Sequence, residues 1–124
     1  MTQLQSVLRL LPTGEVQHFA GDPSASGSTG DRGAAVLARF GNGGPAGIDV
    51  GPDGRVFVGD NGNARIRMID QQGIIHRFAG TSPGAASGNG GSPLLAVLGT
   101  GVIRSAVGPD GAVYLTSRAI RPYG

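Results

Sequence analysis

One sequence pattern returns after 57 to 59 residues, and this period constrains the fold more than any other feature. The tripeptide Phe-Ala-Gly at 19–21 returns at 78–80, and the tetrapeptide Gly-Pro-Asp-Gly at 51–54 returns at 108–111. A repeat of this length is typical of a supersecondary unit that cannot bury its apolar face alone and stacks on neighbouring units. We therefore expect an array of stacked units.

Each unit is predicted to be a meander of short antiparallel strands. In the complete unit, strands are expected over 47–50, 55–60, 64–70 and 74–79, where β-forming residues cluster and the third segment alternates with the period of a half-buried strand. The segment 51–54 should form a tight hairpin turn, because Pro52 presets its dihedral angle and Gly54 can adopt a positive φ. Asn61-Gly62 is a second hairpin signal.

The period divides the chain into three groups of strands separated by two glycine-rich connections. The first connection contains Leu-Ala-Arg-Phe at 37–40, where a helical turn is expected. Because the pattern starts and stops inside a unit, three explanations are open: a fragment of a longer protein, a truncated reading frame, or a protomer that closes a ring by self-association. The predicted segments are 1–20 (last two strands of an incomplete unit), 21–46 (connection), 47–80 (complete unit), 81–101 (connection) and 102–124 (first half of a degenerate unit).

Composition favours a folded chain and narrows the function classes. Glycine accounts for 24 of the 124 residues and proline for 8, a level at which low complexity must be considered, but 39% of the residues are hydrophobic and occur in short alternating runs. The chain has no cysteine, so it can form no disulfide or thiolate site. No apolar run approaches the ~20 residues that cross a bilayer, and no signal peptide is recognisable.

These residues resemble the NHL repeat family, whose units are four-stranded blades of a β-propeller. Segment 60–67, Asp-Asn-Gly-Asn-Ala-Arg-Ile-Arg, is similar to the family pattern D-x-G-N-x-R-I-R, and segments 47–58 and 73–80 also match its pattern. The glycine-rich segments 30–35 and 88–93 resemble an insertion in the longer bacterial and teneurin-like units. The resemblance implies an all-β fold, a partial β-propeller of about two four-stranded antiparallel blades, and an extracellular or cell-surface location if the parent protein is teneurin-like.

The second unit departs from this pattern. It has Thr116, Ser117 and Arg118 where the first unit has Gly59, Asp60 and Asn61, so the D-x-G-N turn is lost. The unit is therefore degenerate, and two units are too few to close a propeller of this kind.

The resemblance implies a non-enzymatic binding or structural module with protein or glycan partners, together with further blades of the same or a neighbouring chain. In a propeller, the loops between the second and third strands share a face with the connections between blades. A binding rim on this face would contain Arg32, Arg39, Asp60, Asn61, Asn63 and Arg118. The alternative is that these side chains are ordinary solvent-exposed polar groups of loops. Asp60 is expected to hydrogen-bond the backbone of its own turn.

Catalytic, metal and cofactor sites are not predicted. His18 and His76 lie on outer strands with no cluster of carboxylates near them in the sequence, and the aspartates fit turn positions better than a calcium loop. One alternative kept open is part of a propeller lyase or hydrolase with a metal in the central channel. RNA binding is the other, although a net charge of +2 with ten scattered arginines disfavours nucleic acid.

Overall fold

The structure is a computed structural model that describes residues 6–41, 45–60, 63, 65–80 and 104–116. Within these residues the chain forms β-strands and one short 3-10 helix, and every strand pairing is antiparallel, which confirms the all-β prediction. The elements in chain order are β1 (Val7–Leu10), β2 (Val16–Ala20), η1 (Ala35–Leu37), β3 (Pro45–Val50), β4 (Val56–Asp60), β5 (Arg65–Ile69), β6 (Ile75–Ala79), β7 (Arg104–Val107) and β8 (Val113–Thr116).

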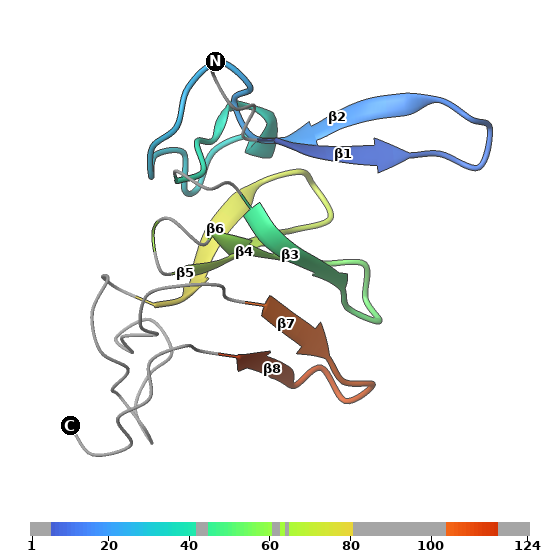
Figure 1. Cartoon of the computed structure of the whole chain (residues 1–124). Helices are drawn as coiled ribbons and strands as arrows, with labels where there is room; N and C mark the ends of the chain where they lie inside the picture. The colour runs from blue at the N-terminus through green and yellow to red at the C-terminus, as the bar shows by residue number, and fades with distance from the viewer. Residues whose placement is uncertain (1–5, 42–44, 61–62, 64, 81–103, 117–124) are drawn as a thin grey trace.

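The strands form three sheets that stack in chain order (Figure 1). The central sheet has the strand order β3-β4-β5-β6 and is a complete four-stranded blade. The hairpins β1–β2 and β7–β8 flank it on opposite sides. By the sequence repeat, β1–β2 correspond to β5–β6, and β7–β8 correspond to β3–β4. This arrangement is a partial β-propeller.

Four hairpin turns share one backbone geometry, as the glycine positions predicted. In each turn a glycine has a positive φ, between 81° and 94°, and donates its N–H to the carbonyl three residues earlier. The glycines are Gly14, Gly54, Gly73 and Gly111. Residues with a Cβ rarely adopt this conformation, so glycine fixes the position at which each strand begins.

Apolar side chains fill the two spaces between the sheets. One buried cluster joins the hairpin β1–β2 and η1 to the central blade, and it includes Phe40, Val58, Ile69 and Ile75. A second cluster around Phe57 and Ile66 lies on the side of the blade that faces β7–β8. Each sheet is thus stabilised by burial against the next one, as expected for a unit that stacks on its neighbours.

The first connection lies along the outer edge of the blade. Backbone hydrogen bonds join Arg32 and Gly33 to Ile75, and the N–H of Ala35 to the carbonyl of Gly73. These contacts cover the start of the free edge of β6, where backbone groups would otherwise be unpaired. The expected helical turn is present, but η1 spans Ala35–Leu37 and so begins two residues before the predicted segment 37–40. The matching segment of the second connection lies outside the described residues.

Candidate functional site

The candidate rim is supported by a buried arginine in the middle of the central blade. Arg67 lies on β5, and its side chain has no exposed surface. Its guanidinium donates to the carbonyl of Arg39 at 2.5 Å and to the carbonyl of Thr29 at 3.0 Å. The guanidinium also lies 5.3 Å from the ring centroid of Phe40, a favourable cation–π distance. Arg67 therefore holds the connection against the blade at several points.

Two carboxylates balance the charge of Arg67. Asp31 accepts from Nε of Arg67 at 3.1 Å, and Asp60 lies 3.4 Å from Nη1. Asp60 is fully buried at the end of β4, and burial raises the pKa of its carboxyl group. Hydrogen bonds from Gly41 and Asn63 and the charge of Arg67 oppose this rise in pKa. A buried charged group is costly unless it is paired and hydrogen-bonded, and this network supplies both.

Asn63 connects the same network to a further part of the connection. Its side-chain amide donates to the carbonyl of Gly27 and to Oδ2 of Asp60, both at 2.8 Å. The other carboxylate oxygen of Asp60 accepts the N–H of Gly41 at 2.8 Å. The two ends of the connection are thus fixed to one turn of the blade.

Two of the three arginines predicted for the rim, Arg32 and Arg39, lie on the outer surface of this fixed connection. Arg32 is exposed and has a φ of 70°, the one positive φ outside glycine among the described residues. The side chain of Arg39 is 47% exposed, and its Nε lies 3.7 Å from a carboxylate oxygen of Asp22. Hydrogen bonds from Ser24 lower the pKa of Asp22, which keeps this carboxylate ionised beside Arg39.

The structure separates the predicted rim residues into groups. Arg32 and Arg39 are at the surface, Asn63 is half-buried, and Asp60 belongs to the interior because its carboxylate is enclosed by the network. Asn61 and Arg118 lie outside the described residues. Among the described residues, Asp60 contacts the side chains of Asn63 and Arg67 and the distant backbone N–H of Gly41. The rest of its own turn, where backbone hydrogen bonds were expected, lies outside the described residues.

Sequence reasoning missed Arg67 and Asp31, which carry most of the network. One signal was available for Arg67. It occupies the centre of β5, a strand with neighbours on both sides in the sheet. An arginine at such a position is rarely buried unless it is paired, so buried partners could be expected.

The two histidines lie apart and have local partners. His18, on β2, is exposed and contacts the carbonyl of Gly21. His76, on β6, lies 2.9 Å from Asp70, and this contact is the main reason for the lowered pKa of Asp70. Within the described part of the chain, no three acidic or histidine side chains gather in a way that could hold a metal ion. None of its helices could cross a membrane.

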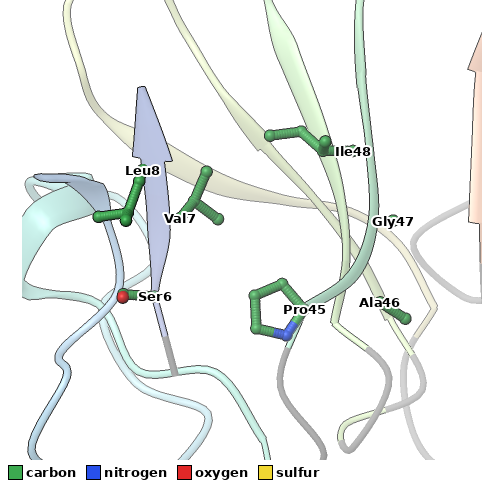
Figure 2. A pocket seen from close by; sticks show the side chains of 7 residues that line it. All are labelled: Ser6, Val7, Leu8, Pro45, Ala46, Gly47 and Ile48. Atoms are coloured by element: carbon green, nitrogen blue, oxygen red, sulfur yellow. The ribbon is translucent and has the colours of Figure 1, made fainter. Parts of the chain in front are cut away.

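A pocket of about 290 Å³ lies between the first hairpin and the central blade. Ser6, Val7 and Leu8 line it on one side and residues 45–48 on the other (Figure 2). Val7 is buried at 9% exposure, whereas Leu8 and Ile48 are more than half exposed. The side chains that line the pocket are therefore mostly apolar, and none of them is ionisable.

The fold and the family comparison agree on the class of protein. Residues 42–67 match the family model described as NHL repeat, which confirms the resemblance and covers β3, β4 and part of β5. The chain therefore contains an NHL repeat within an all-β partial propeller.

A solved structure supports the fold. A structural genomics protein of unknown function from Bacteroides thetaiotaomicron VPI-5482 is similar over 94% of this chain, with 23% sequence identity and a TM-score of 0.74. The present chain spans 28% of that protein's length. No curated protein matches the chain.

Proposed function

We propose that the chain is a non-enzymatic binding module whose first connection presents Arg32 and Arg39 to an acidic segment of a protein partner. The NHL repeat is typical of propeller-type modules that mediate protein interactions, and this supports the general class. The choice of surface rests on the connection, which combines exposed arginines with a fixed backbone.

The observation that carries this proposal is the buried support beneath the exposed arginines. Arg67 and Asn63 donate to three carbonyl groups of the connection, those of Gly27, Thr29 and Arg39. A loop held in one conformation loses less conformational entropy when it binds, so each contact contributes more to affinity. A flexible glycine-rich loop would not have this advantage.

Charge also favours an acidic partner. Arg67 engages Asp60 and the partly exposed Asp31, while the side chains of Arg32 and Arg39 lie at the surface, where Asp22 is an acidic neighbour of Arg39 at 3.7 Å. Guanidinium groups form paired hydrogen bonds with carboxylates and are frequent at protein interfaces.

Binding of the 124-residue chain to arrays of synthetic Asp/Glu-rich peptides and of sulfated and sialylated glycans tests the proposal. Arg32→Ala and Arg39→Ala should each weaken peptide binding about tenfold, equivalent to ~1.4 kcal/mol. Arg55→Ala is the matched control, because it removes the same charge from a hairpin turn away from the connection. Equal binding by all four proteins, or binding to glycans alone, would contradict the proposal.

A further inference from the structure

We propose that the 124-residue chain associates head to tail, so that β7–β8 of one copy and β1–β2 of the next copy together complete a four-stranded blade. The head is defined as β1–β2 with the exposed face of β3. The tail is defined as β7–β8 with the face of β5–β6 that contacts them. This self-association is independent of the ligand proposed for the connection.

Two strand edges in the described residues lack the partner that the complete blade supplies. β1 pairs with β2 alone and β8 with β7 alone, whereas their counterparts β5 and β4 pair with each other. An unpaired strand edge is a template for a strand from another chain. The pairing of β4 with β5 therefore shows how β8 of one copy would meet β1 of the next.

The repeat also supplies the register of this joint. In the complete blade, Val58 stands opposite Arg67. Shifting the two strands by their repeat offsets places Leu115 opposite Leu8 of the next copy, an apolar cross-strand pair. The position of Asp60 is occupied in the sequence by Ser117, so both members of the buried ion pair are replaced together. If only one member of the pair were replaced, the other would be a buried charge without a partner, which is costly.

The head exposes apolar side chains at positions that are buried in the complete blade. Leu10 and Val16 are 75% and 61% exposed. Their counterparts Ile69 and Ile75 have no exposed surface, because the preceding hairpin and connection cover them. In the joint, the β5–β6 face of the preceding copy, with its half-buried Met68 and Phe78, would pack against these side chains of the head.

The tail also exposes a large side chain whose counterpart in the complete blade is buried. Tyr114 on β8 is 65% exposed, although its counterpart Phe57 is fully buried in edge-to-face contact with Phe78, with ring centroids 4.9 Å apart. In the joint Tyr114 would lie over the exposed Ile48 and Val50 of the next copy. β8 would enter beside β1, where the apolar pocket of Figure 2 separates β1 from β3.

One arrangement therefore covers most of the exposed apolar surface of the described residues. Large apolar groups rarely cluster on the surface of a monomer without a partner. The side chains that the joint covers are Leu8, Leu10, Val16, Ile48, Val50 and Tyr114, which leaves Val36 and Leu37 on η1. A head-to-tail contact closes into a ring if its rotation permits. The described residues of each copy form one complete blade and two hairpins, so a ring of about four to eight blades built from this 124-residue chain alone needs roughly two to four copies.

Sedimentation velocity of the purified 124-residue chain tests this proposal. A closed assembly should have about two to four times the 12.4 kDa mass of one chain. Leu10→Lys in the head and Tyr114→Lys in the tail should each abolish assembly, because both positions are interior to the joint. Both side chains are mostly exposed in one copy, so the folded monomer should persist with an unchanged circular dichroism spectrum. Thr13→Lys, at the tip of the first hairpin, is the matched control and should assemble normally.

A mixture of the two variants distinguishes head-to-tail pairing from a symmetric contact. The head variant retains its tail and the tail variant retains its head, so an equal mixture should form one joint and a two-copy complex. A wild-type chain that remains monomeric at all concentrations overturns the proposal. Assembly that survives either lysine variant alone also overturns it.

A gain of affinity provides an independent test. Between β3 and β7 of one copy, the carboxylate of Asp49 accepts the N–H of Val107. Ala106 occupies the position of Asp49 in the tail, is exposed and has no carboxylate. Ala106→Asp should restore this contact across the joint and lower the dissociation constant of the assembly by about tenfold. An unchanged or raised dissociation constant would count against the proposed register.

Discussion

Arg67 and Asp60 form an ion pair with no exposed surface on either side chain, and the Nη1–Oδ2 distance is 3.4 Å. The pair joins neighbouring strands of one sheet, yet most of its remaining hydrogen bonds reach the connection that precedes the blade. Its effect is therefore to attach an irregular segment to a regular one. Buried pairs of this kind often contribute little net stability but are costly to break one member at a time.

Arg67→Leu should lower the free energy of unfolding by about 3–5 kcal/mol, because Asp60 would remain buried without its charge partner. The double variant Asp60→Asn/Arg67→Leu should lose clearly less than the sum of the two single variants. Urea unfolding followed by circular dichroism measures all four proteins. Additive losses would show that the two side chains are not energetically coupled.

Gly30→Ala should destabilise the chain more than Gly14→Ala. Both glycines have a positive φ, 108° and 94°, so each substitution costs about 1 kcal/mol in backbone strain. A Cβ at Gly30 would also lie 2.6 Å from Cα of Ala38, whereas nothing lies within 4 Å of one at Gly14. Thermal unfolding of the two variants checks the order. Equal losses of stability would mean that Gly30 does not lie this close to Ala38 in the folded chain.

Asn63→Ala should loosen the connection while leaving the strands of the blade intact. The substitution removes the donor to Gly27 and one donor to Asp60, at a cost of about 1–3 kcal/mol. Amide hydrogen exchange should become faster at Gly27 and Gly41, whose N–H groups are bonded in the intact network. Protection of β4 and β5 should change little. Uniform acceleration across the blade would indicate global destabilisation instead.

Asp70 should contribute to the loss of folding stability at low pH. His76, followed by the N–H of Ile74, lowers the pKa of Asp70 in the folded chain, so folding favours its ionised form. The resulting stability is present above about pH 4, the ordinary range of aspartate, and is lost as the pH falls through the lowered folded value. Asp60 acts in the opposite direction, because its raised pKa favours the protonated form on folding.

Melting temperatures measured from pH 6 downward test this assignment. Asp70→Asn should be less stable than the wild type at pH 6, and the difference should shrink as the pH falls below about 4. A difference that stays constant with pH would show that the carboxylate acts only through its turn geometry.

The strands and hairpin turns could be predicted because their determinants are local. A glycine at the end of each turn and short runs of β-forming residues are sufficient to place β4 and its neighbours. The interior of the candidate site could not be predicted in this way. The partners of Arg67 in the connection lie 28 to 38 residues earlier in the chain, and no short-range pattern links a strand arginine to groups at that distance. Asp60 was placed on the rim for the same reason, since its turn motif gives no indication of burial.

The attachment of the first connection to Arg67 and Asn63 has a consequence for how such chains can be rearranged. The connection is bonded mainly to the blade that follows it, so the interchangeable block runs from Gly21 to Gly80 and not from strand to strand. Recombination that separates residues 21–41 from residues 45–80 would remove the hydrogen-bond partners that Arg67 has in the connection and leave it with Asp60. Genetic duplication or protein engineering that keeps both segments together would transfer Arg67 and Asn63 with their hydrogen-bond partners in the connection.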